Sequence, residues 1–268
     1  MTKSERAHYT RTPAAWVAGC SDTGLHHTSN QDAMCIAVRD GEPPAGIIAV
    51  ADGVSSAHGS ELASLVAAET VVGALQTLHA EGLPDNVALV RAYHEANGAV
   101  LDARVGDADP SACTLITAHV DGGSVSVANV GDSRAYWLGD DGTAALLSTD
   151  DSVAQARIMM GIPRDDAEQG DQAHAITKWL GLDATDVTPS VTTHQPLTPG
   201  WLLLCTDGLW NYASAPERLG ELVAEQLATN TTPVAAAEAL AAWANEQGGK
   251  DNVTVVLARI EACAQQVG

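Results

Sequence analysis

Residues 47–53 read IIAVADG, an uninterrupted apolar run that ends at Asp52 and a glycine. Residues 202–208, LLLCTDG, repeat the pattern and end at Asp207 and a glycine. Near the C-terminus, Asp251 stands just before a third apolar run. Such runs are typical of strands buried on both faces, and a following glycine allows a sharp turn. If the three strand ends adjoin, three carboxylates share one pocket, where they cannot all stay ionised without a cation.

The donor atoms of such a pocket decide its chemistry. Carboxylate and backbone oxygens favour Mg²⁺ or Mn²⁺, and no histidine or cysteine spacing along the chain indicates zinc. Two such ions can activate a water and hold a phosphoryl oxygen, so the pattern indicates metal-assisted hydrolysis of a phosphate ester. One Asp-Gly pair alone is a weak signal, because most are turns, as expected at Asp121-Gly122 and Asp141-Gly142.

The composition is that of a globular protein with a substantial core. Of the 268 residues, 46% are hydrophobic and 18% are charged. Lys and Arg number 13 against 34 Asp and Glu, a formal net charge of −21. This field repels nucleic acid and anionic membrane surfaces and favours cations, although much of the charge is expected on an ordinary solvated surface. We therefore expect no nucleic-acid and no membrane partner.

Cysteine usage and the N-terminus predict a cytoplasmic protein. The five cysteines form no CxxC pair and lie mostly in or beside apolar runs, at positions 20, 35, 113, 205 and 263. Scattered thiols of this kind are typical of a reducing compartment. Residues 1–12 lack the apolar core of a signal peptide. No uninterrupted apolar stretch reaches the roughly 18 residues that span a bilayer.

The order of the expected elements predicts an α+β layered sandwich. Strands joined by hairpins rather than crossovers favour antiparallel sheets with helices packed outside. We expect a flexible tail over residues 1–13 and one domain over 14–262, in which the polar residues 149–188 form a mobile insertion at one end of the sheets. Helices are expected over Ser60–Ala80, with Ser60 as its cap, and over residues 85–105, 216–229 and 233–247.

Six short motifs follow one another along the chain, at residues 21–24 with 30–33, 50–54 with 59–64, 111–114, 129–134, 204–210 and 249–254. In these motifs, and in residues 174–181, the chain resembles the metal-dependent Ser/Thr protein phosphatases of type 2C (the PPM family), in their bacterial form with a single catalytic domain. The resemblance extends from about residue 15 to residue 260. It implies a four-layer α-β-β-α sandwich, two antiparallel sheets flanked by helix pairs, and it makes residues 149–188 the flap of the family.

The resemblance also implies metal ligands. Asp52 would bridge two Mn²⁺ or Mg²⁺ ions, with the carbonyl of Gly53 on one of them, and Asp207 and Asp251 would complete the other. A water or hydroxide between the two ions would then attack phosphoserine or phosphothreonine.

Further residues acquire roles from the same resemblance. Asp32 would act through water, as a catalytic residue beside the ligands. Asp132, with Asp207, could hold a third ion, or it could be a turn residue that caps the following Ser133. Asp22 and Asn252 would support the ligands from behind, with Asn252 either orienting Asp251 or capping the strand that follows.

The chain departs from the family pattern where the substrate phosphate would bind. The family usually carries an arginine between Asp22 and Asp32, whereas this chain has His27 in that loop. Histidine offers fewer donors than arginine and is mostly neutral at pH 7. His27 either contacts the phosphate or is a solvated loop residue. Val54 stands where some members have a histidine proposed as general acid; His58 or a water could serve instead, and a surface role for His58 is the simpler interpretation.

These observations leave three functional hypotheses. The first is a phosphatase of phosphorylated proteins, with a Ser/Thr kinase or its targets as possible partners. A second is a pseudophosphatase that binds phosphoproteins without hydrolysis, supported only by the missing arginine and by Gln31 in place of the usual Glu. The third is a phosphatase of small phosphorylated molecules.

Overall fold

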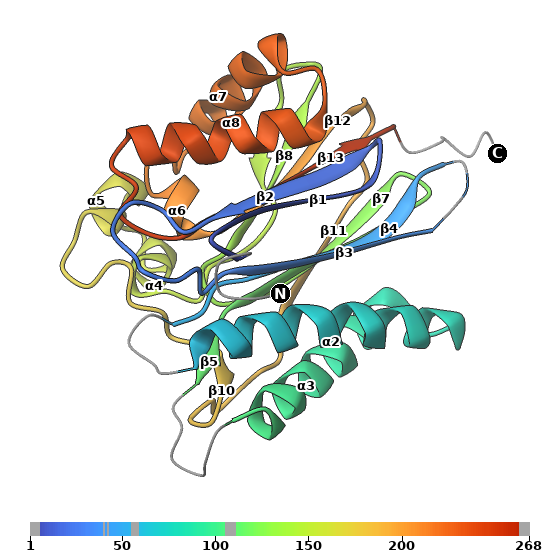
Figure 1. Cartoon of the computed structure of the whole chain (residues 1–268), viewed down its shortest axis with the longest axis vertical. Helices are drawn as coiled ribbons and strands as arrows, with labels where there is room; N and C mark the ends of the chain where they lie inside the picture. Colours follow the sequence, from blue (N-terminus) through green and yellow to red (C-terminus); the bar gives the residue numbers. More distant parts are fainter. Residues whose placement is uncertain (1–5, 40, 42, 55–58, 105–110, 263–268) are drawn as a thin grey trace.

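Two antiparallel β-sheets lie face to face, and a pair of helices covers the outer face of each (Figure 1). This computed structural model describes residues 6–39, 41, 43–54, 59–104 and 111–262. Between the sheets, apolar side chains from both inner faces interlock, among them Ile48, Val50, Ile116, Leu204 and Val256. The four-layer α-β-β-α sandwich implied by the resemblance is therefore confirmed.

The six-stranded sheet contains two of the apolar runs that end at candidate ligands. Its strand order is β1 (His8–Ala14), β2 (Val17–Asp22), β13 (Val253–Ile260), β12 (Gly200–Cys205), β8 (Arg134–Gly139) and β9 (Ala144–Leu146). Leu204 of β12 pairs with Val256 on one side and with Ala135 on the other. Neighbouring strands thus bring the segments around Asp207 and Asp251 to the same end of the sheet.

The expectation of a flexible tail over residues 1–13 is wrong for residues 8–13. These residues form most of β1, which pairs antiparallel with β2 from His8 opposite Asp22 onwards. Arg6, just before β1, is buried and donates to the carbonyl oxygen of Asp32 at 2.6 Å. The sequence HYTRTPA has little apolar content, so its strand character depends on the edge of β2 rather than on its own hydrophobic pattern.

The five-stranded sheet has the order β11 (Ser190–His194), β7 (Ser124–Val130), β6 (Leu115–Asp121), β4 (Ala45–Ala51) and β3 (Ala33–Arg39). All seven residues of β4 are buried, as its uninterrupted apolar run predicts. A separate short ladder pairs β5 (Ala112–Cys113) with β10 (Leu180–Gly181).

The helices form the two outer layers. Those on the five-stranded sheet are α2 (Ser60–Ala80) and α3 (Asp85–Asp102), and those on the six-stranded sheet are α7 (Pro216–Thr229) and α8 (Pro233–Glu246). The bounds of α2 are those predicted, but Gly59 rather than Ser60 is its N-cap, and the Ser60 hydroxyl donates to the Val54 carbonyl oxygen. α3 ends at Asp102, three residues early; position 105 lies outside the described residues. By length and composition α2 could cross a membrane, yet it is a core helix whose small side chains pack on the sheet.

Residues 149–188 join the two sheets at the end where the candidate ligands gather. This segment contains α4 (Val153–Met159), α5 (Arg164–Glu168) and β10. Its second half is fixed to the sandwich, since Leu180 is buried opposite Cys113 and the amide of Gly181 donates to Asn97. The short helix α6 (Asp207–Trp210) lies at the same end of the molecule as α4 (Figure 1).

Candidate active site

Four carboxylates from separate parts of the chain meet at this end of the sandwich. Asp52 follows β4, Asp132 follows β7, Asp207 opens α6 directly after β12, and Asp251 precedes β13. They line one cavity of about 160 Å³, whose other lining residues are Gly53, Val54, Thr114, His174 and Ile176. The strand ends adjoin as the sequence pattern requires.

Asp207 is placed by main-chain contacts between α6 and the start of β13. A side chain at Gly208 would put its Cβ 2.0 Å from the carbonyl oxygen of Asn252, so only glycine allows this approach. The amide of Thr206 donates to the Thr254 carbonyl oxygen at 3.1 Å. Asn211 donates to Oδ2 of Asp207 at 3.0 Å, while Oδ1 is buried without a partner among the described residues.

Asp52 and Gly53 are held by the neighbouring segments of the five-stranded sheet. The Asp52 amide donates to the Thr114 hydroxyl at 3.1 Å, and the Thr114 amide donates back to the Asp52 carbonyl oxygen at 2.8 Å. A Cβ at Gly53 would lie 2.8 Å from the carbonyl oxygens of both Gln31 and Ser60. Gly53 is therefore required for close packing rather than for a left-handed turn.

Asp32 lies behind these carboxylates and is fully buried. Its Oδ2 accepts hydrogen bonds from the hydroxyls of Thr254 at 2.8 Å and Thr206 at 2.9 Å, while Oδ1 has no partner among the described residues. Burial and the nearby charges of Asp251 and Asp207 raise the pKa of Asp32 to about 7, although the two threonines oppose the shift. These threonines have no signal in the local sequence: Thr206 follows β12, and Thr254 is the second residue of β13.

We call Asp32, Asp52, Asp132 and Asp207 the floor of the cavity. Burial, followed by the charges of neighbouring aspartates, raises the pKa of Asp52 and of Asp132 well above the usual range, and that of Asp207 to about 7. Without a cation the floor cannot be fully ionised at neutral pH, because each carboxylate disfavours the charge of the next.

A buried arginine beside the floor, Arg134, already has its charge paired with other carboxylates. Arg134 packs its guanidinium 3.7 Å from the centre of the Trp210 ring. It forms a two-pronged pair with Asp150, with Nη2 2.7 Å from Oδ2, and Nη2 also donates to Glu168 at 2.9 Å. Trp210 in turn donates from Nε1 to the carbonyl oxygen of Asp132 at 2.9 Å. The arginine thus supports the main chain at Asp132 while its charge is already paired.

The donor set of the floor fits a hard divalent cation. All its side-chain donors are oxygens, and the carbonyl group of Gly53 lies beside Asp52. Two buried carboxylate oxygens, Oδ1 of Asp32 and Oδ1 of Asp207, lack hydrogen-bond donors in the described parts of the chain. Buried carboxylate oxygens are costly without a donor or a cation, so these atoms are suited to metal coordination or to ordered water.

His27, Asp251 and His174 form the more exposed rim of the cavity. Nε2 of His27 lies 3.2 Å from Oδ1 of Asp251, and both side chains are about one-third exposed, at 28% and 36%. His174, from the 149–188 segment, lies over Trp210 with 5.8 Å between ring centres. His27 thus contacts a candidate metal ligand instead of standing apart as a solvated residue. His58 lies outside the described residues.

The two residues expected to support the ligands have different positions. Asn252 joins the loop before β3 to β13: its Oδ1 accepts from the Gln31 amide at 2.8 Å, and its Nδ2 donates to the Thr23 carbonyl oxygen at 2.7 Å. Its own amide donates to Oδ1 of Asp251 at 2.8 Å, so it orients that ligand. Asp22 is farther away and does not line the cavity. Its carboxylate accepts from Gly24, Asn245 and His8 and so shapes the turn that starts the His27 loop.

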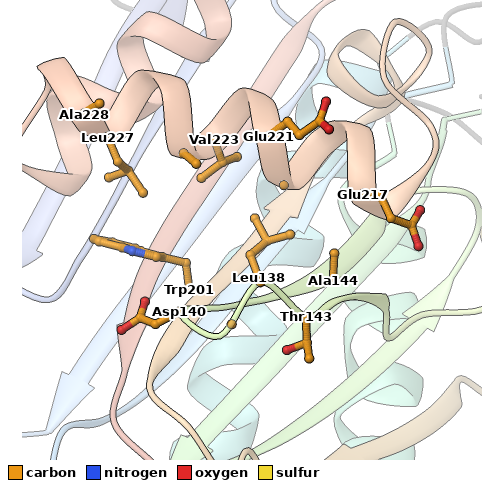
Figure 2. Close-up of a pocket in the computed structure, with 14 residues that line it drawn as sticks. Leu138, Asp140, Thr143, Ala144, Trp201, Glu217, Glu221, Val223, Leu227 and Ala228 are labelled. Carbon is orange, nitrogen blue, oxygen red and sulfur yellow. The ribbon is translucent and has the colours of Figure 1, made fainter.

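A larger cavity of about 640 Å³ lies between α7 and the β8–β9 hairpin (Figure 2). Trp201 and apolar residues of α7 face it, with Glu217, Glu221 and Asp140 at its edges. Asp140 already pairs with Arg259 at 2.6 Å, and Glu221 with Arg218 at 3.2 Å. The titratable groups do not converge there, so the candidate active site remains the smaller cavity.

Comparison with known proteins supports this assignment. A family profile described as protein phosphatase 2C matches residues 25–245. The serine/threonine protein phosphatase PstP of Mycobacterium tuberculosis is 29% identical over 248 residues, which are 91% of this chain and 44% of PstP. This chain therefore spans less than half the length of that relative.

Solved structures of similar proteins share the sandwich. The PPM Ser-Thr phosphatase MsPP from Mycobacterium smegmatis, in complex with cacodylate, is 31% identical with a TM-score of 0.71, over 91% of this chain and 97% of MsPP. The catalytic domain of PstP, in complex with 2 manganese ions, is 26% identical with a TM-score of 0.65, over 94% of this chain and 98% of that domain. By sequence profile and by structure, the chain belongs to the protein phosphatase 2C family.

Proposed function

We propose that this chain hydrolyses phosphoserine and phosphothreonine in proteins with the help of divalent cations. The observation that carries the proposal is the convergence of four carboxylates on one small cavity, with Asp32 directly behind them. Family membership and relatives named serine/threonine phosphatases support the reaction. The manganese in the similar PstP domain supports the choice of Mn²⁺ or Mg²⁺.

We assign the first two ions to Asp52, Asp207 and Asp251 with the carbonyl of Gly53, and a possible third to Asp132 with Asp207. When bound, the cations neutralise the floor, attract a phosphate dianion and lower the pKa of a water. Without them the cavity would repel phosphate, because no Lys or Arg is among the residues that line it.

The chain's own residues would position the reactants. Asp32, fixed by Thr206 and Thr254, presents a free carboxylate oxygen that can accept a hydrogen bond from a water in the cavity. The amide of Asn252 and Nε2 of His27 both lie against Oδ1 of Asp251 and so orient its carboxylate. His27 lies at the rim beside Asp251, and we propose that it contacts the substrate phosphate where related chains have an arginine.

The physiological substrates we propose are proteins phosphorylated by a Ser/Thr kinase. We also propose a reducing compartment such as the cytoplasm, since the four cysteines in the described part of the chain are free thiols. Cys263 lies outside that part.

Metal-dependent turnover tests the proposed function. The full chain, stripped with EDTA, is assayed on p-nitrophenyl phosphate and on phosphothreonine and phosphoserine peptides, with and without Mn²⁺. We expect turnover only with the metal and its loss in Asp207→Ala. Equal rates for Asp207→Ala and wild type would contradict the proposal. Metal and phosphopeptide binding without turnover would favour a pseudophosphatase, and turnover of small phosphorylated molecules alone would favour the third hypothesis.

A further inference from the structure

Two histidines and an aspartate meet at the end of α2 that lies far from the carboxylate cavity. They come from three elements: His79 from the last turn of α2, Asp85 from the start of α3, and His119 from β6. Their candidate ligand atoms all lie within 4.8 Å of one another. Because α2 starts beside Gly53 and rises about 1.5 Å per residue, this cluster is roughly 28 Å from the active site.

The contacts within the cluster converge on one carboxylate oxygen. Oδ1 of Asp85 is 2.9 Å from Nδ1 of His119 and 3.0 Å from Nε2 of His79. The two imidazole rings are stacked, with centres 4.0 Å apart. The pKa of Asp85 is lowered by His119 and, to a smaller extent, by the Ser126 side chain, which stands opposite His119 in the β6–β7 ladder.

Hydrogen bonds alone do not account for this arrangement. His119 is hydrogen-bonded to Asp85 at 2.9 Å. Nε2 of His79 lies 3.0 Å from the same oxygen, but the pair does not have the geometry of a hydrogen bond. This buried nitrogen therefore has no hydrogen-bond partner among the described residues. A buried ring nitrogen without a partner is costly. A cation between the three groups would satisfy this nitrogen. Burial and the neighbouring His119 lower the pKa of His79, which favours the neutral imidazole that binds metals.

We propose that His79, Asp85 and His119 form a second metal site, selective for Zn²⁺ over the ions of the active site. Two imidazole nitrogens and one carboxylate are a ligand set that suits zinc, whereas Mn²⁺ and Mg²⁺ prefer the all-oxygen floor. The site has room for a fourth ligand such as water, because a cavity of about 330 Å³ is lined by both histidines. The ion would join the α2–α3 turn to the central strands of the five-stranded sheet.

Zinc binding in the presence of excess Mg²⁺ tests the proposal, because Mg²⁺ occupies oxygen sites without competing for imidazole. The full chain is stripped with EDTA and titrated with ZnCl₂, and bound zinc is measured by equilibrium dialysis with elemental analysis. We expect one equivalent for the wild type and at least tenfold weaker binding in His79→Ala and His119→Ala. His94→Ala, an exposed histidine of α3, is the matched control and should bind as wild type does.

Two further measurements separate this site from the active site and from misfolding. Asp207→Ala should keep the zinc equivalent, and Co²⁺ should give the visible absorption of a low-symmetry site in wild type but not in His79→Gln. Circular dichroism in EDTA checks that the variants fold. Absence of a zinc equivalent under excess Mg²⁺, or its loss in Asp207→Ala instead of in the histidine variants, would overturn the proposal.

Discussion

The floor and the rim of the cavity are built in different ways. Three floor aspartates, Asp52, Asp132 and Asp207, follow strands, and Asp32 directly precedes β3. Hydrogen bonds to Thr114 and Thr254 fix the chain around Asp52 and Asp207. The rim residues His27 and His174 come from connecting segments, and their side chains lie against Asp251 and Trp210. Rigid elements position groups more accurately than loops do. The floor is therefore suited to the chemistry that the family shares, and the rim to differences in substrate.

Removal of a floor carboxylate should have the largest effect. In Asp52→Asn we expect kcat/KM on a phosphothreonine peptide with Mn²⁺ to fall by about 1000-fold or more, which corresponds to roughly 4 kcal/mol. The same variant should unfold at a higher temperature than wild type in EDTA, because a carboxyl with a strongly raised pKa no longer has to be buried among other acids. Steady-state kinetics and thermal unfolding measure the two effects.

The matched control is Asp121→Asn, which changes an Asp-Gly pair in a surface hairpin, where Asp121 contacts Arg39. Its activity should equal that of wild type. If Asp52→Asn kept activity within tenfold of wild type, the distinction between floor and surface carboxylates would not hold.

The next largest effect should come from Gly208, which brings the floor together. Gly208→Ala places a methyl group 2.0 Å from a backbone carbonyl oxygen that cannot move without shifting β13. We expect a loss of roughly 1–3 kcal/mol in the free energy of unfolding, measured by urea denaturation, together with weaker Mn²⁺ binding. Gly98→Ala, in α3 where the new Cβ meets no atom within 4 Å apart from the nearby backbone of its own helix, should instead stabilise by up to about 1 kcal/mol. Equal effects of the two substitutions would contradict the steric argument.

The main metal-ligand candidates were largely predictable from the sequence, whereas the residues that support them were not. Asp52, Asp207 and Asp251 adjoin long apolar runs, and a buried strand leaves little freedom in where its end lies. Thr206 and Thr254 have no local sequence signal, because Asp32, to which their hydroxyls donate, lies 174 and 222 residues away along the chain.

The N-terminal strand and the histidine cluster show the same limit. The polar sequence of residues 8–13 predicts a tail, because these residues become a strand only where they pair with β2. No zinc spacing was visible because His79, Asp85 and His119 come together only when two helices and a central strand pack. Contacts of high sequence separation are set by the tertiary fold, so local periodicity does not reveal them.

A smaller effect should appear in the pH dependence of stability, which the floor carboxylates control. The folded-state pKa values of Asp32 and Asp207 are raised to about 7 from 3.8, so the metal-free folded protein binds more protons than the unfolded chain between these values. Its stability should therefore fall as pH rises from about 4 towards and through 7. Mn²⁺ should raise the unfolding temperature more at pH 8 than at pH 5.5, by roughly 2–4 °C for each kcal/mol of this difference.

At each pH, the difference between the unfolding temperatures in Mn²⁺ and in EDTA cancels the stability contributions of titrating groups that the metal does not affect. His79 and His194 have lowered pKa values and act in the opposite sense, since their stabilisation is lost as pH falls. Asp32→Asn should flatten the pH dependence of the metal effect. A metal effect that was constant from pH 5.5 to 8 would show that the floor carboxylates do not titrate in this range.

The smallest effect concerns the rim, where a gain is expected rather than a loss. In His27→Arg a permanent charge with a forked set of donors replaces a histidine that has one nitrogen directed at Asp251. We expect KM for a phosphothreonine peptide to fall about three- to tenfold, or roughly 0.7–1.4 kcal/mol, with kcat unchanged. His26→Arg adds the same charge to the exposed neighbouring residue and should leave KM as it is. If both variants lowered KM equally, net charge rather than a contact from position 27 would govern substrate affinity. If kcat alone changed, His27 would act by positioning Asp251, and this part of the rim would serve the chemistry, as the floor does, rather than substrate binding.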